Sequence, residues 1–418
     1  MTRATGKADL PLHGGRVPAW LADRMTLLGR VMAEAIVHHY GRDELLRRLS
    51  HPFWFQSFGA VMGMDWHSSG ITTSVIGALK RGLAPLQREL GIYVCGGRGR
   101  HARQTPAELE HVGEQTGLNA RALAQASRLV AKVDSAAVQD GFDLYLHAFF
   151  VTPTGSWCVI QQGMNAERGQ ARRYHWLSDH VGSFLDSPHA AIDGQPGGTI
   201  LNLAHAGASQ NRQASLDLLH APDRTVAVLK QLRNGNVAQE RNPEFDFGDE
   251  PVPHLQMPAH HDVQASDVDL KRLHGVLAAA ADRGPKDFRE LLLTPGVGQR
   301  TLASLALVAE VIHGAPARFS DPARFSLAHG GKDGHPFPVP LRVYDETLRV
   351  LRSAVNRAKL GNEDRLAAIR RLEVQARRLE KAAEGPSFEE FIARERAVSH
   401  RLGGRSVGAD PLAHLTGA

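Results

Sequence analysis

Apolar residues recur at helical spacing along most of the first 140 positions of this chain. Over residues 18–49 this spacing predicts one long helix that is broken near Gly41. A further helix is expected over residues 71–90. Two more are expected within residues 105–138, where Thr105 has the position of an N-cap three residues before a glutamate. The first part of the chain is therefore predicted to be largely helical.

The period then changes to two residues. Residues 142–152 alternate between apolar and polar, residues 157–162 form a second extended run, and a Pro-Thr-Gly turn separates them. This pattern predicts a β-hairpin, with Asp143 and His147 on one face of its first strand. Residues 171–177 are expected to form a short helix that carries basic and aromatic side chains. We expect an α+β fold, predominantly helical, whose N-terminal domain contains a small mixed sheet.

Residues 286–313 combine two helical patterns with a glycine turn between them. Gly296 and Gly298 allow the backbone to turn sharply and leave room for a ligand to approach. The amides of the turn, and those of the first turn of the second helix, then point outward at the positive end of the helix dipole. That geometry binds an anion such as a phosphate. The sequence thus predicts an all-helical C-terminal domain with an anion-binding hairpin.

The same stretch resembles the helix-hairpin-helix motif of DNA repair and recombination proteins, through its Pro-Gly-Val-Gly hairpin and the Thr-Leu that begins the second helix. The resemblance implies contact with the DNA backbone rather than with a particular base sequence. An ordinary helical hairpin with a glycine turn remains the alternative. The residues expected to contact DNA are Pro295, Gly296, Val297, Gly298, Gln299, Arg300, Thr301 and, in a later glycine-rich stretch, Lys332.

Composition permits a nucleic-acid partner. The 418 residues carry 49 Lys and Arg against 44 Asp and Glu, a formal net charge of +5. No apolar run approaches the ~20 residues of a membrane span, and the first residues lack a signal-peptide core, so a cytoplasmic protein is expected. The 2 cysteines form no CxxC pair, which argues against structural zinc. No GxxxxGK[ST] loop occurs, so intrinsic ATP hydrolysis is not expected.

Three parts are expected along the chain. An α+β catalytic domain would cover residues 1–245, and a stretch rich in Asn, Pro, Asp and Glu would separate it from a helix-hairpin-helix domain at residues 257–345. Residues 346–400 would form an arginine-rich helical extension. Its amphipathic pattern suits packing, homo-oligomerisation or DNA contact.

Several phrases together resemble a family catalogued as a domain of unknown function, number 763. The resemblance spans about residues 7 to 355 and faintly suggests a nuclease. The phrases are residues 8–15, the loop around Asp65, Ala131-Lys132-Val133-Asp134, residues 160–164, residues 172–178 and residues 329–339.

Candidate chemistry for such a function is metal-dependent cleavage of a phosphodiester, which requires carboxylates with His, Gln or carbonyl oxygens completing the metal shell. Three separated segments offer these groups, so their convergence would form a site for Mg²⁺ or Mn²⁺. The expected metal ligands are Asp9, His13, Asp65 and Asp143. The expected catalytic residues are Asp65, Asp143, His147, Gln161, Gln162 and Arg173, with Arg172 and His175 also placed to hold the scissile phosphate.

A metal-dependent nuclease of DNA repair or recombination is therefore the first expectation, and three alternatives remain. A DNA glycosylase would use Asp321, which follows the hairpin at about the spacing of the catalytic aspartate in that class. A non-enzymatic DNA-binding partner of a repair complex would bind without cleavage. An RNA- or nucleotide-modifying enzyme would use the glycine-rich stretches at residues 96–100 and 330–332 to hold a phosphate.

Overall fold

The structure is a computed structural model, and one compact unit comprises residues 1–371. Within the chain it describes residues 10–11, 17, 19–64, 69–194, 199–233 and 270–323, together with short runs between residues 349 and 374. The predicted boundary between residues 245 and 257 lies outside these ranges, as does most of the predicted extension at 346–400.

The predicted long helix with a break near Gly41 is confirmed. Gly41 has φ +90°, a conformation that glycine adopts readily, and it separates two helices. A third helix begins at Pro52, where the His51 ring accepts a hydrogen bond from the Trp54 amide at 3.4 Å. The helices of this part are α1 (Ala19–Tyr40), α2 (Arg42–Ser50), α3 (Pro52–Val61), α4 (Gly70–Leu83), η1 (Ala84–Leu86) and α5 (Gln87–Leu90).

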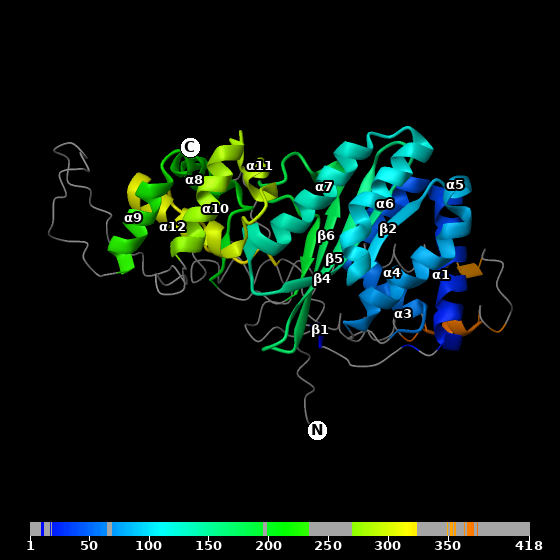
Figure 1. Cartoon of the computed structure of the whole chain (residues 1–418). Helices are drawn as coiled ribbons and strands as arrows, with labels where there is room; N and C mark the ends of the chain where they lie inside the picture. The colour runs from blue at the N-terminus through cyan, green and yellow to red at the C-terminus, as the bar shows by residue number, and fades with distance from the viewer. Residues whose placement is uncertain are drawn as a thin grey trace, which may run out of the picture. The chain divides into compact units, whose positions relative to one another are not determined.

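A six-stranded sheet forms the centre of the unit (Figure 1). The predicted β-hairpin is confirmed as β4 (Asp143–Val151) and β5 (Trp157–Asn165). The strand order is β1-β6-β5-β4-β2, with β7 paired to β6. Every pairing is antiparallel, whereas a mixed sheet was predicted. Short turns join β4, β5 and β6 in succession, and strands joined in this way run antiparallel. The remaining strands are β1 (Leu10–Pro11), β2 (Tyr93–Arg98), β6 (Gln170–Leu177) and β7 (Ala191–Asp193), with β3 (Val138–Gln139) and β8 (Leu201–Asn202) in a separate pair.

The helix predicted at residues 171–177 is wrong, because this segment is strand β6. Its side chains alternate between the two faces of the sheet, and nearly all of them are buried. One face carries Arg173 and His175, which bond groups of α2, α3 and α4. The other face carries Tyr174 and Trp176 within the core cluster. Arg173 and His175 alternate with Tyr174 and Trp176 as in a strand, but the polar side is buried against helices instead of facing solvent.

The opposite face of the sheet is covered by α6 (Arg100–Thr116) and α7 (Ala120–Lys132), which run antiparallel to each other (Figure 1). Helix α6 begins five residues before the predicted N-cap, so Thr105 lies inside it. Pro106 has no N–H to offer the Ala102 carbonyl one turn earlier. The Thr105 hydroxyl donates to that carbonyl instead, at 2.8 Å, and the helix continues through the proline.

The second half of the unit is helical. Its two hairpin helices, α11 (Phe288–Leu293) and α12 (Gln299–His313), lie where the sequence predicts helices. One hydrophobic cluster joins Trp176 of the sheet to Leu277 and to Leu302 of α12. The remaining helical elements of the whole unit are η2 (Val133–Ala137), η3 (Ser178–His180), η4 (Ala206–Ala208), α8 (Ser209–Asp217), η5 (Leu218–His220), α9 (Pro222–Arg233) and α10 (Leu270–Arg283).

This architecture confirms the predicted class, α+β and mostly helical. Within the described residues, no helix is both long enough and apolar enough to cross a membrane.

Candidate functional site

The hairpin between α11 and α12 is built by local contacts. Asp287 caps α11, because its carboxylate accepts the Glu290 amide at 2.9 Å. The Val297 amide donates to the Thr294 carbonyl at 3.1 Å and closes the turn around Gly296, whose φ is +88°. The Val297 side chain is only 2% exposed and anchors the turn in the core. The turn conformation is thus determined by the sequence near it.

The N-terminus of α12 lies uncovered at the end of this turn. Its N-cap is Gly298, with φ −145°, and no side chain of the described residues caps the helix there. A Cβ at Gly298 would meet open space. Pro295, Gly296 and Arg300 are exposed around it, whereas Thr301 is buried. The first amides of a helix have no partner within the helix, so these amides are available to an anion.

Two residues far away in sequence hold the hairpin against the sheet half of the unit. The Lys132 ammonium, at the end of α7, donates to the Val297 carbonyl at 2.8 Å. The Gln139 side chain donates to the Gln299 carbonyl at 2.9 Å, and the Gln299 side chain donates to the Ser135 carbonyl at 2.8 Å. Burial lowers the pKa of Lys132. The side chain of Gln299 is therefore engaged by the fold, while Arg300 remains exposed.

Four predicted site residues lie outside the described residues: Asp9, His13, Asp65 and Lys332. The chain flanking two of these segments is described. Leu10 and Pro11 pair with Ala171 and Gln170 on β6. Gln162 of β5 donates to the Ser69 carbonyl at 3.3 Å, four residues after Asp65. Both flanks thus contact neighbouring strands of the sheet.

Asp143 and His147 do not share a face, contrary to prediction. A β-bulge between Leu144 and Leu146 shifts the register of β4 against β5. Asp143 is opposite Met164, on the face that carries Gln162, whereas His147 is opposite Gln161 on the other face. The predicted catalytic set is therefore divided by the sheet: Asp143, Gln162 and Arg173 lie on one face, and His147 and Gln161 lie on the other.

His147 belongs to a buried hydrogen-bond chain. Its Nδ1–H donates to the side-chain amide oxygen of Gln161 at 2.7 Å, and its Nε2 accepts from the Ser127 hydroxyl at 2.9 Å. Gln161 donates in turn to Asp134, which also accepts from Trp176 at 2.9 Å and His189 at 2.5 Å. Burial lowers the pKa of His147 and keeps the ring neutral. Ser127 is only 2% exposed, so this arrangement of Ser, His and Asp does not meet solvent.

On the other face, Arg173 is enclosed by partners. Its guanidinium pairs with Asp193 at 2.7 Å and donates to the Gln56 side chain at 2.9 Å and to the His175 ring at 2.9 Å. It is 0% exposed, so its guanidinium does not reach solvent, where a scissile phosphate would bind. Beside it, the Gln162 side-chain oxygen is buried without a hydrogen-bond partner among the described residues.

Arg172 and Asp321 form a buried ion pair. Two guanidinium nitrogens of Arg172 contact the two carboxylate oxygens of Asp321 at 3.0 and 2.8 Å, and Asp140 accepts a further bond from Arg172 at 2.9 Å. The Asp321 side chain is 2% exposed. The Asp321 carboxylate is thus engaged by Arg172, and no observation favours the glycosylase alternative.

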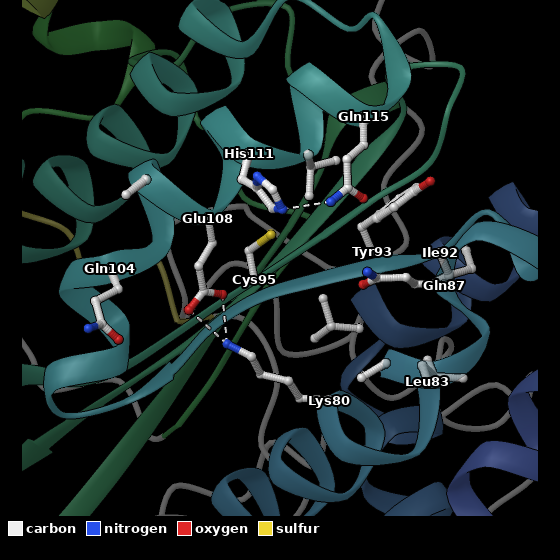
Figure 2. Close-up of a pocket in the computed structure, with 14 residues that line it drawn as sticks. Lys80, Leu83, Gln87, Ile92, Tyr93, Cys95, Gln104, Glu108, His111 and Gln115 are labelled. Carbon is white, nitrogen blue, oxygen red and sulfur yellow. Dashed lines mark hydrogen bonds and ion pairs between the residues drawn. The ribbon is translucent and has the colours of Figure 1, made fainter.

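One groove was not anticipated from the sequence. A cavity of about 540 Å³ runs along the outer edge of β2, between α4 and α6 (Figure 2). At one end the Lys80–Glu108 ion pair, at 2.7 Å, bonds both the carbonyl and the amide of Gly96. That contact blocks further strand pairing at Gly96. Burial raises the pKa of Cys95, in the groove wall, to about 12, so the thiol is unreactive.

The described residues contain no group of three or more His, Cys, Asp or Glu that could hold a metal ion. Comparison with known proteins gives one match. A family model described as "Protein of unknown function (DUF763)" matches residues 6–339. No curated protein and no solved structure matches the chain.

Proposed function

Because the chain belongs to the DUF763 family, whose description states no activity, we propose its function from the hairpin: the protein binds the phosphate backbone of DNA. The supporting observation is the N-terminus of α12, which no side chain of the described residues caps. Its N-cap is Gly298, and no packing contact of the described residues requires a glycine there. The φ of Gly298 suits any residue, and a Cβ there would meet open space. A glycine at this position lets a ligand approach the backbone closely, whereas the fold does not need a glycine there.

Substitution of Gly298 by aspartate tests the proposal. Aspartate is a favourable N-cap, so Gly298→Asp is expected to preserve or raise the melting temperature. Its carboxylate would occupy the anion site and repel a phosphate. We expect DNA affinity to fall by about tenfold or more, the equivalent of one charge-assisted hydrogen bond.

The measurement is fluorescence anisotropy of a labelled duplex at low salt. Gly182→Asp is the matched control, because Gly182 is an exposed loop glycine that also faces open space. A Gly298→Asp protein that binds DNA as tightly as the wild type would refute the hairpin as the DNA site.

A second proposal concerns catalysis: cleavage of the bound DNA with Mg²⁺ or Mn²⁺. What favours it is the face of the sheet that carries Asp143 and Gln162. Gln162 contacts the carbonyl of Ser69, four residues after Asp65, and its own side-chain oxygen has no partner among the described residues. Carboxylate and amide oxygens are the ligands that these cations prefer. His147 and Gln161 lie on the opposite face and are left out of this site.

Cleavage of labelled DNA in the presence of Mg²⁺ or Mn²⁺ tests the second proposal. Asp143→Ala should abolish the cleavage and leave DNA binding intact, because Asp143 is exposed and is not among the residues proposed to contact DNA. Undiminished cleavage by Asp143→Ala would exclude this site. Binding without cleavage under either metal would instead favour the non-enzymatic DNA-binding alternative.

A further inference from the structure

Exposed arginines lie on α6 and α7, two helices that cover the sheet. Arg128 lies on the exposed side of α7, one turn before Lys132, which contacts the hairpin at the Val297 carbonyl. Arg100 and Arg103 are exposed at the start of α6. These three arginines are called the α6–α7 basic surface below.

The start of α6 and the end of α7 lie side by side. Ser127 of α7 bonds the His147 ring, and a Cβ at Gly97, the residue paired with His147 on β2, would lie 3.4 Å from the His101 side chain of α6. Arg128 contacts Glu110 at 3.9 Å, and because the helices are antiparallel, Arg103 lies further toward the end of α7 that reaches the hairpin. The three arginines thus lie on a helix pair whose α7 end contacts the hairpin through Lys132.

We infer that Arg100, Arg103 and Arg128 bind DNA phosphates beyond those held by the hairpin, so that the bound duplex runs across α6 and α7. The inference rests on the proposed DNA-binding function and extends it. The three arginines lie on two neighbouring helices, so the surface they form spans about one helix spacing plus one helical turn. That length is roughly 15 Å, or about four base-pair steps of DNA. Arginine suits this role because its planar guanidinium pairs with two phosphate oxygens at once.

The charge available on this surface is only partly neutralised. Among the described residues, Glu110 is the one acid that forms an ion pair with any of the three arginines; it contacts Arg128 at 3.9 Å, and both of these side chains are 55% exposed. Such a contact between exposed groups is weak and readily exchanged for a phosphate. The buried Arg172 and Arg173, by contrast, are fully engaged by aspartates and take no part.

The test compares two double variants of equal charge change. Arg103→Glu/Arg128→Glu alters the α6–α7 basic surface. Arg88→Glu/Arg168→Glu is the control, because Arg88 and Arg168 are exposed arginines in α5 and in the β5–β6 turn. Anisotropy of a labelled duplex is measured over a series of NaCl concentrations, and thermal melts confirm that each variant is folded.

The dependence of log affinity on log salt has a slope of about −0.9 per phosphate contacted. The surface variant should therefore bind at least about tenfold more weakly than the control, with a salt slope shallower by about two. Equal DNA affinity and equal salt slope in the two double variants would overturn the inference. The hairpin proposal would still stand after that result if Gly298→Asp loses DNA binding.

Two remaining outcomes also distinguish the basic surface from the hairpin as the DNA site. Loss of binding in the surface variant with normal binding by Gly298→Asp supports the basic surface and refutes the hairpin. A wild-type protein that binds no duplex at low salt refutes both.

Discussion

His175 offers the sharpest quantitative test of the buried network beneath the sheet. Its ring is 0% exposed, its Nδ1–H donates to the Leu49 carbonyl at 3.1 Å, and its Nε2 accepts from Arg173 at 2.9 Å. Burial, followed by the charge of Arg173, lowers the pKa of His175 well below its ordinary value. A proton on Nε2 would also face the Arg173 N–H, so the folded protein requires a neutral ring.

The pH dependence follows from this requirement. In the unfolded chain His175 binds a proton below the ordinary histidine pKa of 6.5, whereas in the folded chain it does not. The unfolded state therefore gains protons first as the pH falls, and the free energy of unfolding decreases by about 1.4 kcal/mol per pH unit for each such histidine. At about pH 5 the loss for this single ring is roughly 2 kcal/mol. The stability is fully present above pH 6.5 and is lost as the pH falls toward the folded pKa.

Urea denaturation of the wild type and of His175→Gln, from about pH 7.5 to about pH 5, measures this effect. Glutamine retains an acceptor for Arg173 but does not titrate. The variant should therefore be less stable at neutral pH and lose less stability on acidification, by roughly 2 kcal/mol over this range. His220→Gln, at an exposed position, is the control. If His175→Gln and the wild type lost stability in parallel, the ring would titrate freely in the folded protein and the reasoning would be wrong.

Two further predictions concern contacts between distant segments. Asp321→Ala removes one of the two aspartates that pair with the buried Arg172 and leaves Asp140, so the free energy of unfolding should fall by about 1.5–3 kcal/mol in chemical denaturation, and a fall below about 1 kcal/mol would contradict a buried pair. Lys132→Met keeps the aliphatic stem but removes the donor to the Val297 carbonyl. Hydrogen exchange of the hairpin amides should then accelerate by about fivefold to tenfold, the equivalent of one hydrogen bond of ~1 kcal/mol, while exchange in β5 stays unchanged.

Much of the secondary structure was predictable because its causes are local. The break at Gly41 and the β4–β5 hairpin both follow from residues within a few positions of each feature. Two predictions were wrong for physical reasons that spacing does not reveal. Thr105 lies inside α6, because its hydroxyl takes the place of the N–H that Pro106 lacks. The segment 170–177 is a strand, and its polar side chains Arg173 and His175 bond groups of the helices on that face instead of meeting solvent.

In the candidate site too, some features depend on neighbouring residues and others on tertiary contacts. The sequence alone determined the hairpin turn, since a glycine with φ +88° and an N-cap glycine need only their neighbours in the chain. Tertiary structure alone decided what surrounds it. Lys132 meets the hairpin across 165 positions, and Arg172 meets Asp321 across 149.

The faces on which the predicted catalytic residues lie were also decided only by folding. A single extra residue at the β4 bulge separated Asp143 from His147, although their spacing in sequence is that of one strand face. Periodicity reports how each segment buries its own apolar side. The partners of a buried polar group are chosen by packing between segments, and only the assembled fold specifies that packing.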